Sequence, residues 1–136
     1  MNYTAFKDQL IAHEGLRLKP YADTVGKLTI GVGRNLDDAG ISTHEAMLLL
    51  DHDIEAVEDD LDQRLPWWRG LTETRQLVLA DMCFNLGVSR LQGFKNTLAA
   101  IHAGDYEAAA DGMLASKWAG QVGKRAHRLA RMLREG

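Results

Sequence analysis

The spacing of apolar residues along the chain predicts a mainly helical protein with one small sheet near its N-terminus. Residues 4–13 carry apolar positions on one side of a helix, and Gly15 is placed to end it. The apolar period then changes to two residues in KLTIGVG, which is typical of a strand. Turn residues at 23–26 precede this strand, so residues 18–34 are predicted to form a hairpin.

Helices are predicted over the rest of the chain. Ser42 and Glu45 form a capping-box pattern at the start of a long helix, 43–62. Thr72 is placed to cap a helix over 73–85, which is apolar almost all round and is predicted to be the buried centre of the second half. Three shorter helices are predicted over residues 95–102, 105–115 and 123–134.

These elements predict an α+β fold, mainly α, with two lobes in a single domain. A small αβ lobe would span about residues 14–60, and a helical lobe would span about residues 61–136 together with the N-terminal helix, 1–13. The long helix would join the two lobes. A chain of 136 residues can build one domain with a core but not two independent domains. A cleft between two such lobes is a natural place for a ligand.

The composition is that of a globular protein kept in a reducing compartment. Hydrophobic residues make up 46% of the chain and charged residues 26%. No apolar run reaches the length of a membrane span, and the N-terminus lacks the apolar core of a secretory signal, so we expect the chain to stay in the cytoplasm where it is made. The single cysteine, Cys83, excludes an internal disulfide and is expected to be buried and inert.

The net charge of −3 is unevenly distributed along the chain. Residues 37–62 hold ten Asp and Glu and no Lys or Arg, whereas residues 117–136 hold six Lys and Arg and one acid. The arginines at 125, 128, 131 and 134 recur every three residues, so they spread over much of the circumference of the last helix. A solvated helix is the favoured interpretation. Contact with anionic polymers or lipid head groups of the cell envelope is the alternative, and DNA binding is disfavoured.

Metal-binding and aromatic signals are weak. His44 and His52 lie two turns apart without a third ligand, so neither a metal nor a cofactor is expected. Trp67 and Trp68 could stack on sugars, but packing on the core is the more expected role for one or both of them.

The strongest candidate chemistry lies in HEGLRLKPYADTVGKLTIGVGR. Glu14 ends a helix, where the dipole disfavours an ionised carboxylate, and Asp23 lies in a polar turn, where solvent favours one. Thr29 shares a strand face with Gly31 and Gly33, so a sugar or a water can come close. Glycosidic bond cleavage commonly uses two carboxyl groups in such different states. From spacing alone, however, an ordinary helix-to-hairpin connection is favoured, because each residue is common in its place.

The frame EGLRLKPYxDxxGxxTIGxG resembles the phage-type lysozymes, the T4-lysozyme-like endolysin family of muramidases, in which the positions of Glu14, Asp23 and Thr29 are catalytic. Further segments that resemble the family follow in order, namely MCFNLG, GFKNTLAAIHAGDYEAAA and SKWAGQVGKRAHR. The resemblance therefore covers nearly the whole chain. The stretch NLDDAGIS is much shorter than in the longest members, which predicts a trimmed small lobe.

The resemblance implies a peptidoglycan hydrolase that cleaves the β-1,4 bond between N-acetylmuramic acid and N-acetylglucosamine. Glu14 would be the general acid, while Asp23 and Thr29 would activate a water on the opposite face of the sugar, the inverting arrangement. It also implies that Arg125 pairs with the catalytic glutamate, which would favour the ionised form against the helix dipole; that balance stays open. Tyr21, Asn85 and Gln121 match family positions near the cleft, and with Gly31 they are expected to contact the substrate.

The resemblance further implies a monomeric endolysin that needs no metal or cofactor and lyses Gram-negative hosts. It would be made in the host cytoplasm and reach the wall through another component such as a holin. The alternative is a non-catalytic wall-binding or structural module that keeps the lysozyme fold, against which the intact Glu14, Asp23 and Thr29 argue. A DNA- or membrane-acting helical protein would depend on the basic helix, 123–134, and not on Glu14.

Overall fold

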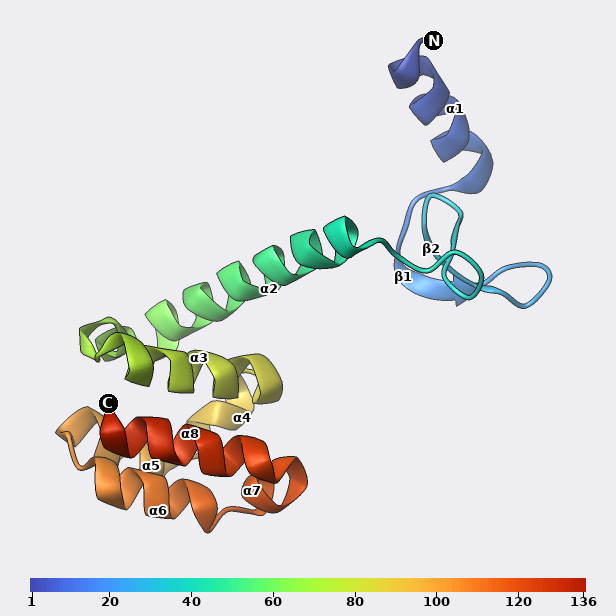
Figure 1. Cartoon of the computed structure of the whole chain (residues 1–136). Helices are drawn as coiled ribbons and strands as arrows, with labels where there is room; N and C mark the ends of the chain where they lie inside the picture. The colour runs from blue at the N-terminus through green and yellow to red at the C-terminus, as the bar shows by residue number, and fades with distance from the viewer. The chain divides into compact units, whose positions relative to one another are not determined.

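The computed structural model describes the whole chain, residues 1–136, as two compact units, residues 1–49 and residues 50–136. The first unit contains one complete helix, a three-stranded sheet and the start of the long helix, and the second is helical (Figure 1). The expected mainly helical α+β fold is confirmed. The elements are α1 (Tyr3–Glu14), β1 (Arg17–Ala22), β2 (Leu28–Gly31), β3 (Arg34–Asn35), α2 (Thr43–Arg64), η1 (Pro66–Gly70), α3 (Glu73–Leu86), α4 (Val88–Gln92), α5 (Lys95–Ala103), α6 (Tyr106–Leu114), α7 (Lys117–Val122) and α8 (Lys124–Glu135).

The sheet of the first unit is antiparallel, with the strand order β1-β2-β3. Thr29 on the central strand pairs with Tyr21 on β1 and with Asn35 on β3. The expected hairpin over 18–34 is therefore extended by a third strand. Because that strand is only two residues long, no alternation of apolar and polar residues could mark it in the sequence.

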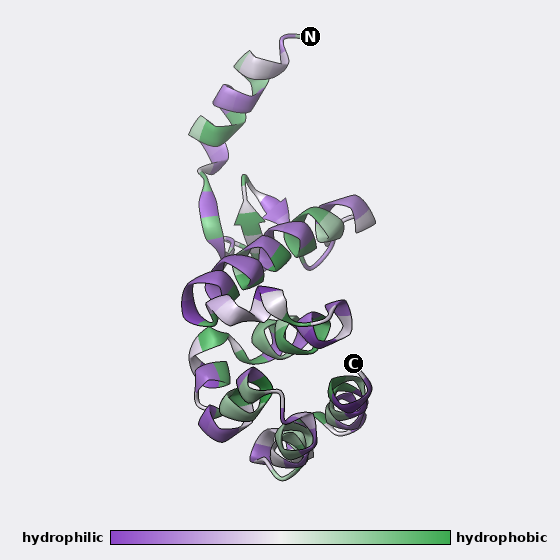
Figure 2. Ribbon diagram, turned by 90° about the vertical axis from the view of Figure 1, so that its left-hand side faces the viewer, coloured by the Kyte–Doolittle hydropathy of each residue, from purple (hydrophilic) through white to green (hydrophobic).

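The apolar core lies wholly in the second unit. Its largest fully buried side chains are those of Leu61, Val78, Leu79, Met82, Leu91, Ile101, Met113 and Leu133. In Figure 2 the helices of this unit are green on some sides and purple on others, as amphipathic helices are. In the first unit the only buried residue is Thr29, so the first unit has no apolar core of its own.

α3 begins as predicted and runs through the core, but it is not buried all round. The hydroxyl of Thr72 caps the helix by accepting the backbone N–H of Arg75 at 3.2 Å. One side of the helix is buried through Val78, Leu79, Met82, Cys83 and Leu86. Leu77 and Phe84 remain 60% and 48% exposed on the other side, so the expectation of complete burial is wrong there.

Within the second unit α3 contacts η1, α4 and α8, while α6 contacts α5, α7 and α8 (Figure 1). α5, α6 and α8 are the three shorter helices predicted from the sequence, with bounds that differ by at most two residues. α4 and α7 were not predicted, because helices of five and six residues are too short to display a helical period. None of the helices combines the length with the apolar character needed to cross a membrane.

α2 begins at the predicted capping box. The backbone N–H of Ser42 donates to Oε1 of Glu45 at 2.9 Å, and the N–H of Glu45 donates to the Ser42 hydroxyl at 3.1 Å. Arg34 on β3 donates to the same Glu45 oxygen at 2.9 Å and to the carbonyl of Gly40 at 3.1 Å. Arg34 therefore ties the end of the sheet to the start of α2. Its hydrogen bond, with those from Ser42, lowers the pKa of Glu45 to about 2.

We expect this carboxylate to contribute stability that is lost in acid. The folded pKa of about 2 lies below the ordinary value of about 4.3, so the contribution is complete above that value and disappears as the pH falls toward 2. A Glu45→Gln variant does not titrate there. It should melt below the wild type at pH 6 and nearly match it at pH 2, as followed by circular dichroism. A melting-temperature gap that is as wide at pH 2 as at pH 6 would contradict this assignment.

Candidate active site

Glu14 is the last residue of α1, and its carboxylate lies against the turn that follows β2. Gly15, with φ +78°, ends the helix and donates its N–H to the carbonyl of Ile11 at 2.8 Å. A Cβ at Gly33 would lie only 2.8 Å from Oε2 of Glu14, so glycine is required for this close approach. Since β2 ends at Gly31, Gly33 belongs to this turn and not to the strand face on which it was expected.

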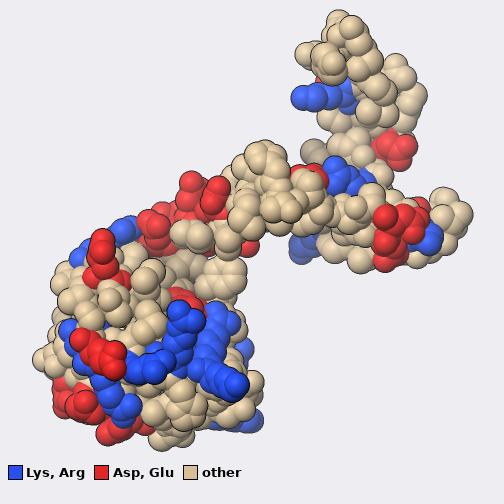
Figure 3. Space-filling view, in the orientation of Figure 1, with Lys and Arg blue, Asp and Glu red and all other residues tan.

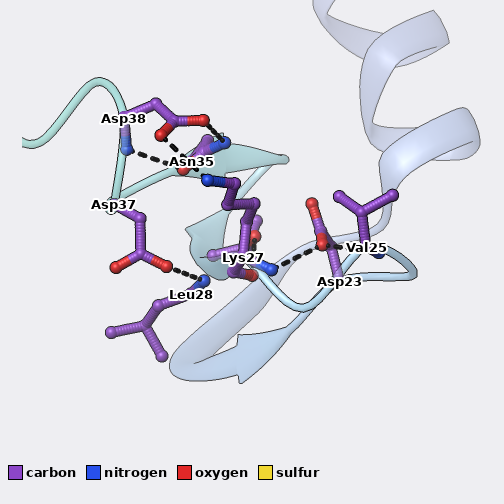
Figure 4. Close-up of polar contacts among 8 residues, drawn as sticks. Asp23, Val25, Lys27, Leu28, Asn35, Asp37 and Asp38 are labelled. Atoms are coloured by element: carbon purple, nitrogen blue, oxygen red, sulfur yellow. Dashed lines mark hydrogen bonds and ion pairs between the residues drawn. The ribbon is translucent and has the colours of Figure 1, made fainter.

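Asp23 closes the turn between β1 and β2 with its own side chain (Figure 4). Its Oδ1 accepts the backbone N–H of Val25 at 2.9 Å and that of Lys27 at 2.8 Å. Its own N–H donates to the carbonyl of Lys27 at 2.9 Å. This is the side-chain-stabilised turn that aspartate favours. Because both donors use Oδ1, the second oxygen, Oδ2, is left without a protein hydrogen bond and can accept one from water.

Thr29 is joined to Asp23 through the backbone of Lys27. The Thr29 hydroxyl donates to the Lys27 carbonyl at 2.9 Å, the same oxygen that receives the N–H of Asp23. Thr29 is only 3% exposed. Since its proton is committed to Lys27, the Thr29 oxygen faces any further partner as an acceptor. The sequence did not single out Lys27, because the groups that it contributes are backbone atoms.

The segment 35–38 lies at the β3 edge of the sheet, where it is hydrogen-bonded to β2 and within itself (Figure 4). Asp37 accepts the backbone N–H of Leu28 at 2.7 Å, one residue before Thr29. The side chain of Asn35 accepts the N–H of Asp38 at 3.0 Å and donates to its carboxylate at 2.9 Å. The short NLDDAGIS stretch therefore forms its own network of hydrogen bonds, which its sequence did not predict.

Tyr21 and Gly31 are placed by the pairing of β1 with β2. Tyr21 lies directly opposite Thr29, so the two side chains share a face of the sheet. The guanidinium of Arg17 lies 4.6 Å from the centre of the Tyr21 ring, and Arg17 is also the residue opposite Gly31. The first unit thus holds five of the residues singled out in the sequence, namely Glu14, Tyr21, Asp23, Thr29 and Gly31.

Asn85 and Gln121 lie in the second unit, around a buried tryptophan. Asn85 accepts the indole N–H of Trp118 at 2.8 Å, and Trp118 packs edge-on against Phe94 with ring centres 6.0 Å apart. Gln121 and Lys117 lie at a hollow of about 290 Å³ that Trp118 and Phe94 also line. This hollow offers aromatic surface and polar groups together, a combination that suits a sugar or a peptide.

Arg125, on α8, is held by Asp81 on α3. The two side chains form an ion pair at 2.7 Å, and the guanidinium also reaches the backbone carbonyl of Asp81 at 3.5 Å. Nothing in the sequence marks Asp81 as this partner. The pairing of Arg125 with Glu14 that the resemblance implies stays a prediction.

The first unit therefore presents two kinds of acid–base group. One carboxylate, from Glu14, ends a helix. A second, from Asp23, accepts the backbone N–H of Lys27, and the Thr29 hydroxyl donates to the carbonyl of the same residue. The second oxygen of Asp23, Oδ2, keeps the capacity to accept a hydrogen bond from water. Two carboxyl groups on separate elements are what glycoside hydrolases commonly use.

The chain belongs to the phage lysozyme family. The family model described as phage lysozyme matches residues 11–134, nearly the whole chain. This confirms the resemblance predicted from the sequence. The protein is therefore a lysozyme, a glycoside hydrolase that acts on peptidoglycan.

Several viral proteins are similar to the chain over most of its length. The endolysin of Salmonella phage P22 is 34% identical over 123 residues, which cover 83% of this chain and 81% of the relative. The SAR-endolysin of Escherichia phage Mu is 34% identical over 131 residues, which cover 88% of this chain and 73% of the relative. The pre-baseplate central spike protein Gp5 of Enterobacteria phage T4 is 29% identical over 95% of this chain, but the chain spans only 27% of that longer protein.

Proposed function

We propose that Glu14, Asp23 and Thr29 cleave the β-1,4 bond between N-acetylmuramic acid and N-acetylglucosamine during lysis of the host cell. Glu14 gives a proton to the oxygen that leaves the sugar, and Asp23 takes a proton from the attacking water. The observation that supports this proposal is the Lys27 backbone, which donates its N–H to the Asp23 carboxylate and accepts the Thr29 hydroxyl at its carbonyl. Because Glu14 belongs to a different element, α1, it can protonate the glycosidic oxygen from another side of the bond.

The proposal includes inversion at the anomeric carbon. Oδ2 of Asp23 and Oγ1 of Thr29 can hold one water between carboxylate and sugar, which is the task of a general base and not of a nucleophile. The α-anomer should then be the first product of cleavage, as read by proton NMR before mutarotation. Initial appearance of the β-anomer would mean a retaining mechanism and a direct attack by Asp23.

A test of Asp23 is an Asp23→Asn variant, which keeps an oxygen for the two backbone donors of the turn but loses the base. We expect clearing of outer-membrane-permeabilised Gram-negative cells to slow by at least about 100-fold, with little change in melting temperature. Asp37→Asn is the matched control, because it makes the same change in the same sheet at a carboxylate that binds only Leu28. Clearing by Asp23→Asn at the wild-type rate would reduce Asp23 to a turn residue.

The proposed substrate contacts extend to five further residues. Gln121 lines the aromatic hollow beside Trp118, which can receive a polar part of the wall polymer, and Asn85 accepts the indole N–H of that tryptophan. On the sheet, Tyr21 shares the face of Thr29 and Gly31 leaves its backbone open there, while Arg125 brings a cation from α8. The partner is the glycan strand of peptidoglycan, taken by a monomer without a cofactor. The protein is made in the host cytoplasm and acts at the wall.

We also propose that residues 1–13 fold with the helical lobe, 61–136, which makes the whole chain one domain. α1 buries no side chain and leaves Phe6 and Leu10 42% and 37% exposed. The second unit contains an apolar groove of about 1030 Å³ between α2, α3 and α8. Exposed apolar side chains on a helix and an open apolar groove each gain free energy when covered.

A double variant, Phe6→Ala with Leu10→Ala, tests this grouping. If α1 packs on the helical lobe, urea unfolding should report a loss of more than about 1 kcal/mol, because buried apolar groups are removed. Exposed residues tolerate such changes within about 0.5 kcal/mol. The control is Leu16→Ala with Leu18→Ala, which truncates two exposed leucines outside α1. Equal stabilities of both double variants and the wild type would contradict the grouping.

A further inference from the structure

The turn that carries Asp23 is held by polar contacts and not by apolar packing. Val25, near its tip, is 76% exposed, and Thr29 is the only buried residue of the first unit. The backbone of Lys27 donates its N–H to Asp23 at 2.8 Å and accepts the Thr29 hydroxyl at 2.9 Å. The positions of both side chains therefore depend on how the backbone of Lys27 is fixed.

The side chain of Lys27 connects this backbone to the segment 35–38. Its Nζ lies 3.3 Å from Oδ1 of Asp38, eleven residues further along the chain. Figure 4 shows the Lys27 side chain extending from the turn toward that segment. Acidic and basic side chains lie together on the surface of this sheet in Figure 3. The ion pair is thus a contact between two parts of the sheet that surround Thr29.

Asp38 is itself held in place by Asn35. The side chain of Asn35 accepts the N–H of Asp38 at 3.0 Å and donates to its Oδ2 at 2.9 Å, so that Oδ1 is left for Lys27. Asn35 is also the residue of β3 that pairs with Thr29. The contacts therefore form a closed ring, which runs from Thr29 through Asn35, Asp38 and Lys27 back to the Thr29 hydroxyl. A ring of this kind limits the movement of each member more than one isolated surface contact does.

We propose that Lys27 and Asp38 are positioning residues, whose ion pair keeps Asp23 and Thr29 aligned to hold the attacking water. This inference rests on the proposed function of Asp23 and Thr29. Neither Lys27 nor Asp38 contacts the substrate in this role, and both act through the backbone of Lys27. Displacement of a reacting group by about 1 Å costs about 100-fold in rate, so a small shift of this backbone is enough to slow the reaction.

A surface ion pair without a role in the reaction is the alternative. Both side chains are exposed, at 43% for Lys27 and 62% for Asp38, and such pairs add little to the stability of a protein. The alternative predicts that loss of the pair leaves kcat unchanged. A positioning role predicts a lower kcat at an unchanged KM, because no contact with the substrate is removed.

The test is the release of reducing ends from solubilised, uncrosslinked peptidoglycan strands. Lys27→Met keeps the backbone and nearly the length of the side chain but loses the cation. Its kcat should fall about fivefold, since an exposed ion pair shifts an equilibrium by up to about that factor. KM should stay within about twofold. Asp38→Ala should have the same effect, whereas Lys27→Arg, which keeps a cation for Asp38, should retain kcat within about twofold.

The double variant Lys27→Met with Asp38→Ala should be no slower than either single variant, because all three lose the same contact. The matched control is Lys19→Met, at an exposed lysine of the same sheet that takes part in no ion pair, and it should keep the wild-type kcat. Three results would overturn the positioning role, namely a wild-type kcat in both single variants, a raised KM at an unchanged kcat, and multiplied losses of about 25-fold in the double variant.

An Asp23→Asn variant in the same assay separates this inference from the proposed function. If Asp23→Asn loses at least about 100-fold while Lys27→Met and Asp38→Ala keep the wild-type kcat, only the positioning role fails. If Asp23→Asn itself keeps the wild-type kcat, the proposed function fails, and the positioning role fails with it.

Discussion

A Glu14→Gln variant is expected to hydrolyse purified peptidoglycan roughly 10²–10⁴-fold more slowly than the wild type. Glutamine has nearly the shape of glutamate, so it can occupy the same place against Gly33. It has no acidic proton to give to the leaving oxygen, so the departing sugar would have to leave as an alkoxide. The rate of appearance of new reducing ends measures this loss directly.

Glu55→Gln provides the control for this variant. Glu55 is exposed on α2 and takes part in no ion pair, so the same chemical change there should leave the rate within about twofold of the wild type. Both variants should retain the wild-type melting temperature within a few degrees. Equal rates in Glu14→Gln and the wild type would remove Glu14 from the mechanism, whatever the behaviour of Asp23.

A Leu79→Ala variant is expected to lose about 2–5 kcal/mol of the free energy of unfolding. Leu79 is 0% exposed at the centre of α3, so its truncation removes buried apolar surface and leaves a cavity that the surrounding helices fill only in part. Small domains have a total stability of about 5–15 kcal/mol, so this single change should consume a large share of it. Urea unfolding, followed by circular dichroism, measures the difference.

Leu18→Ala makes the same chemical change at a residue that is 83% exposed. Its effect should stay within about 0.5 kcal/mol, because little apolar surface returns to water on unfolding. A similar loss in both variants would show that the apolar core is not centred on α3.

The long helices could be predicted from the sequence because period and capping residues agree there. Ser42 and Glu45 form the capping box that their spacing predicts, and Thr72 caps α3. The two-residue β3 and the short α4 and α7 lack a recognisable period, and they depend on the packing of their neighbours. The exposed side of α3 was not predicted, because apolar composition shows which side chains can be buried but not which of them the neighbouring helices cover.

The residues of the candidate site could be predicted only where the side chain carries the chemistry. Asp23 and Thr29 stand out as side chains, but the Lys27 backbone that links them uses groups present in every residue. Pairs such as Arg125 with Asp81, or Asn85 with Trp118, join residues far apart in the chain. Which of several acids or amides becomes the partner is decided by how the helices pack.

The sequence predicted the burial of the cysteine and of one tryptophan, but not the partners of the tryptophans. Cys83 is buried as expected, at 2% exposure, and burial raises the pKa of its thiol. Trp68 is buried in the core, where its indole N–H donates to Asp62 at 2.7 Å. Trp67 instead stacks on His102 with ring centres 4.6 Å apart. The sequence favoured core packing for one or both tryptophans, and it could not assign the two partners.

The central claim is that this lysozyme cuts the glycan strand at N-acetylmuramic acid, and the most direct test is to identify the sugar that carries the new reducing end. Purified sacculi are digested with the wild-type protein, reduced with borohydride, hydrolysed with acid and examined for amino-sugar alcohols. The account predicts that muramitol accumulates with digestion and that glucosaminitol does not. Accumulation of glucosaminitol, or solubilised wall without any new reducing end, would contradict it.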